Sequence, residues 1–429
     1  MTFPVTSMIS VEEARARILA FFERLPVERQ PLLDALGQVL AEAVVAPFDI
    51  PPLDNTAMDG YAVRAVDTSG ASEREPQELR VIADLAAGYV METPVGPGDA
   101  VRIMTGAPLP PGADAIVPFE ETDEPLRGVN EAARRASVVR VFKAAAAGAN
   151  IRYRSEDVRQ GQTVIPAGRP VRASEIGVLA SIGLTTVPVF RRPVVAILST
   201  GDEITEPGEP LQPGRIYDAN AHSVAALVKS YGGIPRLLGI AHDTVEDLTR
   251  KIHEGLDADM LVTSAGVSRG DFDVVKDVLA REGAIDFWTV RMKPGKPLAF
   301  GSFMAPDGRR VPHLGLPGNP VSSMVSFELF GRPAIFKMLG KSGWERPVLR
   351  AITRDAVVNT DARRFYARCI VTTGEDGRYY ADLTGPQGSG ILTSMSAANG
   401  LTIIPEDQPR AEPGDEIDVM MLDWEQPAG

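Results

Sequence analysis

Apolar and polar positions follow two alternating patterns along the second half of the chain. Short apolar runs, typical of buried strands, alternate with stretches in which apolar residues recur every three or four positions, typical of helices. The expected strands are residues 194–198, 234–240, 285–290 and 311–316, with a further run that begins at 260, and the expected helices are residues 220–231, 245–254, 272–282 and 321–339. Strands separated by helices of this length favour a parallel, doubly wound sheet. We therefore expect ligands beyond the carboxyl ends of these strands.

The stretch at residues 260–273 is central to this pattern. Its apolar run ends in hydroxyls and glycines, and Asp271 then precedes apolar residues at helical spacing. A strand, a tight loop and a helix are predicted. Such a loop directs backbone N–H groups and the positive end of a helix dipole at one point, where a phosphate binds well. An ordinary turn between a strand and a helix is the alternative, and the loop taken alone favours it.

The first half of the chain predicts helices around a β-rich insertion. Residues 10–24 match an amphipathic helix capped by Ser10, with Glu13 completing the capping box, and residues 32–43 suggest a second helix. Short β-type runs at 100–104 and 115–118 are separated by Gly and Pro turns. We expect a solvated loop at residues 120–135 and a helix at 173–182 that packs on the first two helices. We also expect Asp243 to cap the helix at 245–254.

These patterns predict a multidomain α/β protein. Strands at residues 371–373, 379–383 and 401–404 mark a last small β domain. The expected domains are a helical linker domain (1–50 and 144–190), an inserted β-rich domain (51–143), the α/β domain (191–340) and a C-terminal β domain (341–429).

Composition excludes several classes of protein. With 44% apolar and 24% charged residues the chain is typical of a soluble globular protein. A net charge of −13 argues against general binding of nucleic acids or anionic membranes. No apolar run approaches the ~18 residues of a membrane-spanning helix. The single cysteine, Cys369, suits a reducing cytoplasm, where we expect the protein to reside.

Polar side chains that follow the predicted strands provide the candidate chemistry. They are Glu203, Asp243, Ser264, Ser268, Asp273, Lys293, Lys296 and Asn319. Because the carboxyl ends of parallel strands share one edge of a sheet, a single rim could gather all of them. Lysines and carboxylates together suit a phosphate and a divalent cation such as Mg²⁺. In the first half, Asp54 and Asp59 flank a polar turn for which metal or hydroxyl contacts and a plain Asx-rich turn are equally favoured.

The chain resembles a known family, the molybdopterin molybdenumtransferases of the MoeA type, which are related to the C-terminal part of gephyrin. Seven short motifs carry the resemblance, in order along nearly the whole chain. They are Asp-Asn-Thr-Ala-Met-Asp-Gly-Tyr-Ala (54–62), Arg-Ile-Met-Thr-Gly-Ala-Pro (102–108), Ser-Thr-Gly-Asp-Glu (199–203), Gly-Val-Ser (266–268) with Asp273, Lys-Pro-Gly-Lys-Pro (293–297), Leu-Pro-Gly-Asn-Pro-Val-Ser (316–322) and Gly-Pro-Gln-Gly-Ser (385–389).

The resemblance implies a fold, an assembly and a reaction. The fold is a MogA-like molybdopterin-binding sheet domain combined with the linker, insertion and small β-barrel domains. The assembly is an elongated homodimer, in which each active site lies between the sheet domain of one subunit and the N- and C-terminal parts of the other. The reaction joins molybdate to adenylylated molybdopterin with Mg²⁺, giving molybdenum cofactor and AMP. Contact with the adenylyltransferase of the same pathway is left open.

The resemblance also implies roles for individual residues. Glu203, Asp243 and Asp273 match the acidic set that handles Mg²⁺ and molybdate, and Lys293 and Lys296 match the lysines that hold anionic groups. The remaining matches are to residues that line or shape the same site, namely Asp59, Thr105, Asp157, Ser264, Gly266, Ser268, Pro317, Asn319, Pro320, Arg363 and Ser389.

Two positions depart from the family pattern, and three alternatives stay open. Ala265 and Ser155 stand where the family usually has glycine. A Cβ on Ala265 has little effect in an extended conformation but would be strained in a left-handed one. The alternative functions are a molybdopterin adenylyltransferase and a non-catalytic cofactor carrier or scaffold. Tungstate in place of molybdate is the third alternative.

Overall fold

The computed structural model describes residues 8–127, 136–264 and 274–422. The chain separates into two compact units, each described here by itself. The first consists of Met1–Glu42, Gly168–Ile176 and Thr186–Gly429, and the second of Ala43–Ala167 and Gly177–Thr185. Within the described ranges, no helix has the length and apolarity needed to cross a membrane.

A six-stranded sheet is the centre of the first unit. Its order is β15 (Ile234–Ala241), β12 (Val194–Thr200), β16 (Met260–Ser264), β20 (Arg310–Leu316), β19 (Pro297–Met304) and β17 (Gly283–Thr289). The first four strands are parallel, and β19 is antiparallel to both of its neighbours. The doubly wound domain is confirmed, but the wholly parallel sheet is wrong at β19, a strand that the pattern did not predict. Only five residues join β19 to β20, too few for the crossover that a parallel pair requires.

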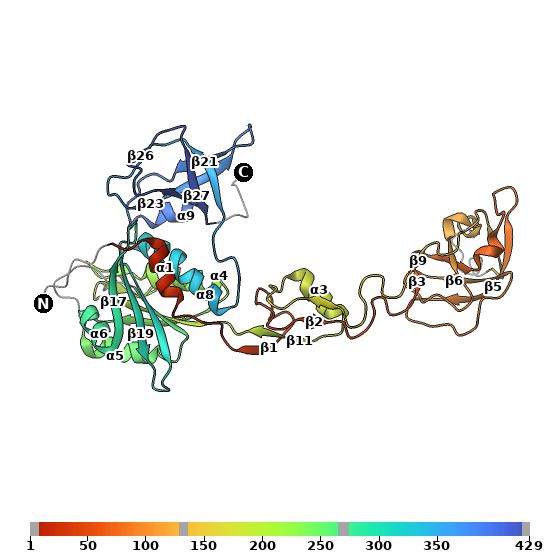
Figure 1. The fold of residues 1–429 in the computed structure, drawn as a ribbon, viewed down its shortest axis with the longest axis horizontal. Coiled ribbons are helices and arrows are strands. Elements are labelled where there is room, and N and C mark those ends of the chain that lie inside the picture. The colour runs from red at the N-terminus through yellow and green to blue at the C-terminus, as the bar shows by residue number, and fades with distance from the viewer. Residues whose placement is uncertain (1–7, 128–135, 265–273, 423–429) are drawn as a thin grey trace. The chain divides into compact units, whose positions relative to one another are not determined.

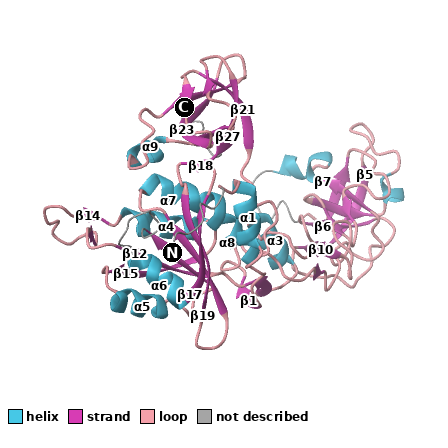
Figure 2. Cartoon of the chain, turned by 60° about the vertical axis from the view of Figure 1, so that its left-hand side comes forward, coloured by secondary structure: helices cyan, strands magenta, loops and turns pink. Residues whose placement is uncertain are grey.

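Helices cover both faces of this sheet, as Figures 1 and 2 show. Alternate residues of β12 enter different cores: Val195 and Ile197 pack in one core, and Ala196 and Leu198 in the other. This alternation is the two-residue period of a strand that is buried on both faces. The first core is closed by α1 (Val11–Leu19), α4 (Ala219–Ser230), α7 (Pro320–Ser326), the π-helical η4 (Phe327–Gly331) and α8 (Arg332–Met338). The second core is closed by α5 (Val245–Glu254) and α6 (Val274–Glu282).

A closed five-stranded barrel forms the end of the first unit. Its strands pair in the order β23 (Arg364–Thr373), β24 (Tyr379–Leu383), β21 (Val348–Thr353), β27 (Glu416–Met421) and β25 (Gly400–Ile404), and β25 returns to pair with β23. The predicted small C-terminal β domain is therefore confirmed as a barrel. The short strand β18 (Met292–Lys293), which follows β17, adds to β23 from outside the ring. The smaller elements here are α9 (Leu392–Ala397), β22 (Val357–Val358) and β26 (Arg410–Ala411).

The second unit contains a five-stranded sheet with an apolar core on each face. The order is β7 (Ala115–Pro118), β4 (Gly60–Val63), β6 (Asp99–Ile103), β5 (Gln77–Leu85) and β8 (Val138–Val141). Two small ribbons, β3 (Asn55–Thr56) with β9 (Ile151–Arg152) and β2 (Val44–Val45) with β10 (Thr163–Ile165), complete it together with the short 3₁₀ helix η1 (Ala65–Thr68). The predicted β-rich character of this region is confirmed.

Two local predictions are wrong. Residues 32–43 form turns rather than a helix, because Gly37 has φ 80° and Leu40 makes a bridge to Val189. The stretch at 120–135 is not simply a solvated loop: it contains η2 (Phe119–Glu121) and η3 (Glu124–Arg127), and Glu124 is buried against the guanidinium of Arg102. Residues 128–135 lie outside the described ranges.

Of the two predicted helix caps, one is confirmed and one is wrong. Ser10 accepts the N–H of Glu13 as expected, although α1 already ends at Leu19. The cap of α5 is Thr244, whose hydroxyl accepts the N–H of Asp247, and not Asp243. The helix α3 (Ala173–Ser181) is confirmed, and the strands β1 (Val27–Pro31) and β11 (Thr186–Phe190) pair with each other. The four domain boundaries stay a prediction.

Candidate functional site

The strand ends of the central sheet form one rim. Because β19 is reversed relative to both neighbours, β17 runs in the same direction as the four parallel strands, and its C-terminal end reaches the same edge. The register places Thr200 beside Ala241 and Ser264 beside Leu316. The loops that carry Glu203, Asp243, Lys293, Lys296 and Asn319 all leave this edge, as the strand pattern predicted.

Acidic residues occupy the end of the rim formed by β12 and β15. The Glu203 carboxylate lies so close to Gly201 that a Cβ on Gly201 would be 2.4 Å from Oε2. Asp202 Oδ1 accepts the N–H of Asp243 at 3.3 Å and lies 3.2 Å from Nδ1 of His242. This contact joins the two loops, so Glu203 and Asp243 lie at neighbouring strand ends. Asp202 was missed by the sequence analysis, although it stands in the Ser-Thr-Gly-Asp-Glu motif.

Beyond this loop, β13 (Ile204–Thr205) and β14 (Ile216–Tyr217) form a two-stranded ribbon. The N–H of Ile216 donates to the carbonyl of Glu203 at 2.8 Å, so the backbone of Glu203 is fixed by the ribbon.

The middle of the rim is organised by an asparagine that the sequence analysis did not single out. Asn220 Nδ2 donates to Ser264 Oγ at 3.0 Å and to the carbonyl of Gly318 at 2.7 Å. The Thr200 hydroxyl donates to the carbonyl of Ser264 at 3.2 Å. Ser264 is buried, and Asn220 connects its hydroxyl with the loop after β20. The only sequence signal for Asn220 is its place in the first turn of α4.

The loop after β20 brings three predicted residues to the start of α7. Pro317 is buried, Asn319 is the N-cap residue without a side-chain capping bond, and Pro320 is the first helical residue. The N–H of Val321 donates to the carbonyl of Ser389 at 3.1 Å, which ties this helix start to the barrel.

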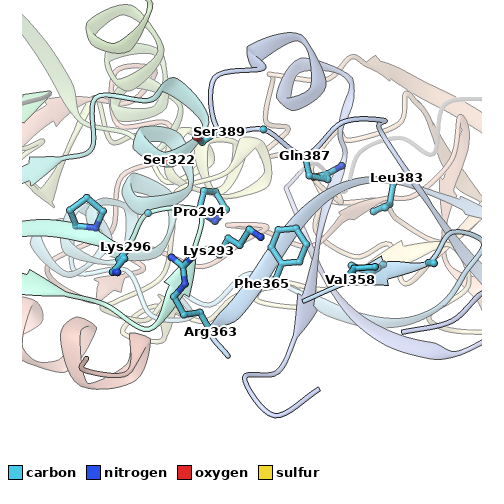
Figure 3. A pocket seen from close by; sticks show the side chains of 15 residues that line it. Lys293, Pro294, Lys296, Ser322, Val358, Arg363, Phe365, Leu383, Gln387 and Ser389 are labelled. Carbon is cyan, nitrogen blue, oxygen red and sulfur yellow. The ribbon is translucent and has the colours of Figure 1, made fainter. Parts of the chain in front are cut away.

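A cavity of about 660 Å³ lies between the rim and the barrel, within the first unit. Four predicted site residues, Lys293, Lys296, Arg363 and Ser389, line it. Figure 3 shows the first three gathered near one another, with Gln387 and Leu383 toward another wall. The apolar part of the lining includes Val357, Val358, Phe365 and Leu383, and Ser322 and Gln387 add polar groups. The volume is in the usual range of small-molecule sites, about 300–1,000 Å³.

Two of the three cations in this cavity share a carboxylate. Lys293 Nζ lies 3.4 Å from Asp361 Oδ2 and 4.9 Å from the centre of the Phe365 ring. Arg363 also donates to Asp361, and its Nη1 donates to the carbonyl of Met292 at 3.2 Å. The hydrogen bond from Arg363 lowers the pKa of the Asp361 carboxyl from its usual value. Asp361 therefore stays ionised near neutral pH and was missed by the sequence analysis.

Lys296 differs from Lys293 in its surroundings. It lines the cavity, and among the residues that the structure describes no carboxylate lies within ion-pair distance of its ammonium group. Its carbonyl accepts the N–H of Val290 at 2.8 Å, so its backbone position is fixed. Among the described residues, the cavity thus holds one ammonium group without an ion-pair partner beside two partly neutralised cations.

The resemblance implies that the last domain reaches the site from another subunit, and this stays a prediction. Within this chain, two residues of the last domain contact the sheet domain. Arg363 contacts Met292 of the same chain, and the Ser389 carbonyl accepts a bond from α7 of the same chain. The pairing of β18 with β23 explains this arrangement, because it links the Lys-Pro-Gly-Lys-Pro loop directly to the strand that begins at Arg364.

Asp59, Thr105 and Asp157 belong to the second unit. Asp59 Oδ1 accepts both the N–H and the hydroxyl of Thr105, each at 2.7 Å. These two bonds lower the pKa of the Asp59 carboxyl, first through the backbone N–H and then through the hydroxyl. Asp157 is exposed, and its N–H donates to the carbonyl of Ile50 at 3.0 Å.

The predicted site includes residues of the loop at 265–273. Asp273, Gly266 and Ser268 lie outside the described residues, as does Ala265. Over the ranges that the structure describes, no cluster of three His, Cys, Asp or Glu side chains has metal-binding geometry. Glu203 and Asp243 are the two described members of the predicted Mg²⁺ set.

Comparison with known proteins accounts for nearly all of the chain. Residues 9–183 match the MoeA N-terminal region (domain I and II), residues 196–337 match a probable molybdopterin-binding domain, and residues 350–422 match the MoeA C-terminal region (domain IV). A molybdopterin molybdenumtransferase 2 of Mycobacterium tuberculosis is 38% identical over 424 residues, which is 97% of this chain and 100% of that protein. The chain belongs to the molybdopterin molybdenumtransferase family.

Further relatives agree with this membership. The molybdopterin molybdenumtransferase of a Nostoc species is 35% identical, over 98% of this chain and 95% of its own length. Two crystal structures of the molybdopterin biosynthesis MoeA protein from Pyrococcus horikoshii align with TM-scores of 0.79 and 0.76. They are 31% and 29% identical to this chain, and each alignment covers 97% of this chain and 100% of theirs. The resemblance drawn from the seven motifs is confirmed, as is the fold class.

Proposed function

We propose that this protein inserts molybdate into adenylylated molybdopterin and releases AMP, a step of molybdenum cofactor biosynthesis. The observation that carries the proposal is the cavity at the sheet rim, where Lys293, Lys296 and Arg363 converge. Both substrates are anions, and the net charge of −13 means that anions are attracted only where the chain concentrates cations locally. The family relatives carry the name of this activity.

The cations of the cavity are suited to fixed oxyanions. Lys293 and Lys296 stand on a turn with a proline after each lysine, which restricts the backbone between the two ammonium groups. Arg363 adds a planar guanidinium, which binds oxyanions in a defined direction. We assign these three residues, with Ser389, to anionic substrate groups. The lysines would offset the charge that develops on the AMP phosphate as it leaves.

The acidic end of the rim fits Mg²⁺. Glu203 and Asp243 lie on adjoining strand ends, and among the described residues neither carboxylate has a hydrogen-bond or ion-pair partner. Mg²⁺ prefers such carboxylate oxygens and keeps several waters. We propose that Glu203, Asp243 and Asp273 hold the ion. Bound Mg²⁺ supplies a Lewis acid that polarises phosphoryl oxygens.

The remaining predicted residues would orient the substrates. We assign Ser264, Gly266 and Ser268, with Pro317, Asn319 and Pro320, to the binding of the pterin substrate at the rim. The Asn220 contacts to Ser264 and Gly318 support this, because they hold the two loops in one arrangement. Asp59, Thr105 and Asp157 are assigned to the same reaction. The homodimer and a cytoplasmic location are parts of the same proposal, and the buried, unpaired thiol of Cys369 is consistent with the location.

The alternatives are not favoured. An adenylyltransferase would need the sheet domain, yet this chain also matches the MoeA N- and C-terminal regions over residues 9–183 and 350–422. A carrier would bind the pterin without molybdate-dependent release of AMP.

One assay tests the proposal. Purified full-length protein is mixed with adenylylated molybdopterin, and AMP is measured with and without molybdate, with tungstate as a third arm. Release that depends on the oxyanion is expected, and it should be lost in Glu203→Ala and Asp273→Ala proteins that remain folded. Glu246→Ala is the matched control, because Glu246 is an exposed acid near the same rim. AMP release that is equal without any oxyanion would contradict the proposal, and light scattering would test the homodimer.

A further inference from the structure

Arg368 has the largest side chain that is fully buried in the described residues, and it lies behind one wall of the cavity. Its guanidinium donates to three consecutive backbone carbonyls: Nη2 to Pro386 at 3.1 Å and to Gly388 at 3.0 Å, and Nη1 to Gln387 at 3.1 Å. Nε donates to Ser394 Oγ at 3.1 Å. One side chain therefore fixes the directions of three successive peptide groups.

A second set of bonds locks the same loop to the backbone of Arg368. The Gln387 side chain accepts the Arg368 N–H at 2.8 Å and donates to the Arg368 carbonyl at 3.1 Å. The side chain of each residue thus binds the backbone of the other. This reciprocity restricts residues 386–388 more than an ordinary surface loop.

The charge of Arg368 is unusual for a fully buried residue. No carboxylate pairs with it in the described part of the chain, and the guanidinium is stabilised by backbone carbonyls and the Ser394 hydroxyl. Burying an ion without a counterion is costly, so such a group persists only where its hydrogen bonds are well made. Arg368 lies on the face of β23 opposite the barrel core, into which Ala367 and Cys369 pack. An apolar residue would fill this buried position at a lower cost. The charge therefore has a role that packing alone does not explain.

The orientation of the loop suggests that role. In a trans peptide the N–H of a residue points away from the carbonyl of the residue before it. Because the carbonyls of residues 386–388 are directed at Arg368, the N–H groups of Gln387, Gly388 and Ser389 are directed away from it. These three residues line the cavity with Lys293, Lys296 and Arg363. Within the described ranges, none of the three N–H groups has a protein acceptor.

We propose that Arg368 is a positioning residue that turns the N–H groups of Gln387, Gly388 and Ser389 toward the cavity as donors to a tetrahedral oxyanion. The carbonyl ends of the peptide dipoles face the guanidinium, and their positive ends face the anion. The donors are fixed before the anion arrives, so little reorganisation accompanies binding. This inference rests on the proposed function for the identity of the oxyanion, which is either free molybdate or a phosphate group of the pterin substrate.

The test measures binding and amide exchange in the full-length protein. Molybdate alone and inorganic phosphate alone are the two probes, and their dissociation constants are measured by calorimetry. Arg368→Met, which removes the charge and all four bonds, is expected to weaken binding about tenfold or more. Arg368→Lys should restore part of this loss, because it keeps the charge. Arg350→Met is the matched control, since Arg350 lies on the same barrel in an exposed ion pair with Glu416.

Hydrogen exchange provides a readout that a merely structural role would not change. In wild-type protein, molybdate or phosphate should slow amide exchange at residues 387–389, and the anion that does so identifies the source of the oxyanion. Wild-type affinity in folded Arg368→Met protein would overturn the inference, as would a lack of protection by both anions. If the Arg368 variants do not fold, the wild-type exchange result decides.

The outcomes also separate this inference from the proposed function. Protection of residues 387–389 without oxyanion-dependent AMP release would leave the loop as an anion site and overturn the function. Oxyanion-dependent AMP release without that protection would support the function and overturn the inference about the loop.

Discussion

Gly201 lies directly against the carboxylate of Glu203, at the end of β12. A Cβ on Gly201 would be 2.4 Å from Oε2 and 2.8 Å from Cδ, and its φ of 131° is one that residues with side chains rarely adopt. Gly201→Ala should therefore displace the Glu203 carboxylate from the rim. We expect at least a tenfold lower rate of AMP release and a higher Mg²⁺ requirement, measured by titrating Mg²⁺ in the release assay.

The control for this prediction is Gly208→Ala. Gly208 also has a positive φ, 100°, but nothing lies within 4 Å of the position its Cβ would take. The backbone strain is similar in kind, so a loss of stability should be shared by both variants. Equal Mg²⁺ dependence in the two proteins would show that the Glu203 position is not what matters.

Thr105 holds Asp59 through two bonds to one oxygen, which can be removed separately. Thr105→Ala removes the hydroxyl bond but keeps the N–H bond, so the pKa of Asp59 should rise part of the way toward its ordinary value. Thr105→Ser keeps both bonds and should leave the pKa lowered. Carbon-detected NMR of the aspartate carboxyl groups would follow the titration. Identical Asp59 titrations in the Ala and Ser variants would contradict the assignment.

The sign of the linked stability change follows from the lowered pKa. A carboxyl whose folded pKa lies below its unfolded value contributes stability above the unfolded pKa, and this contribution is lost as the pH falls through the folded pKa. Wild-type protein should therefore lose this contribution at a lower pH than Thr105→Ala protein does. The pH dependence of this stability difference should appear only below the pKa that aspartate has in the unfolded chain.

The rim was predictable from the sequence because both of its causes are local. The apolar spacing that predicts a strand or a helix is visible within a short segment of sequence. Polar residues after buried strands mark the edge of the sheet where ligands bind. The strand β19 was missed because Pro297 and its apolar run follow a loop of two lysines, and nothing local reveals a reversed strand. The acids and lysines of the rim were found because they follow strands that local patterns predict. β19 was not found because the direction of a strand leaves no local pattern.

The cavity could not be predicted, because its walls are far apart in the sequence. Lys293 and Phe365 come together through the pairing of β18 with β23, which no local pattern specifies. Asp361 and Arg368 have ordinary sequence surroundings, and their roles depend on contacts with residues 292–293 and 386–388. The residues between 265 and 273 remain a sequence prediction.

Lys296 lines the cavity and has no ion-pair partner among the described residues, and its removal should affect binding more than folding. Lys296→Met keeps most of the side-chain length and removes the charge. We expect the KM for adenylylated molybdopterin to rise about tenfold, equivalent to ~1.4 kcal/mol of binding free energy. Lys229→Met, on the exposed side of α4, is the matched control. An unchanged KM in the Lys296 variant, with the control also unchanged, would remove Lys296 from the substrate site.

The π-helical segment η4 carries a buried ionic cluster that should matter for stability. Glu328 accepts from Arg346 Nε at 2.6 Å, lies 3.5 Å from Arg332, and accepts the hydroxyl of Tyr231. Glu328→Gln leaves the buried guanidinium of Arg332 and the partly buried one of Arg346 without their anion, and should lower the free energy of unfolding by about 3–5 kcal/mol. Tyr231→Phe removes one donor and should lower it by about 1–2 kcal/mol. Urea unfolding would measure both.

An exposed pair provides the comparison for this cluster. Arg350 and Glu416 form an ion pair at 3.3 Å, and both side chains are more than half exposed, at 61% and 63%. Glu416→Gln should change the unfolding free energy by less than about 1 kcal/mol. Losses of similar size for Glu328→Gln and Glu416→Gln would show that burial does not strengthen the cluster.

His313 lies on β20, is fully buried beside β16, and should make the protein sensitive to acid. Its Nε2 lies 2.9 Å from Thr263 Oγ1, and its Nδ1 is buried without a partner in the described residues. Burial lowers the pKa of His313 to about 3, so the folded protein keeps the ring neutral where the unfolded chain would protonate it. Because the unfolded state then binds more protons, stability is full above the unfolded pKa and falls as the pH drops toward the folded pKa.

The expected slope is at most ~1.4 kcal/mol per pH unit, between the ordinary histidine pKa of about 6.5 and the folded value. Urea unfolding of wild-type and His313→Gln proteins from pH 4.5 to 8 would measure it. The carboxyl groups contribute equally to both proteins, so the difference between the two profiles isolates the histidine. The variant should be less stable at pH 8, and the gap should narrow as the pH falls below 6.5. Parallel profiles over this range would mean that the ring is protonated in the folded protein, against its burial and its missing Nδ1 partner.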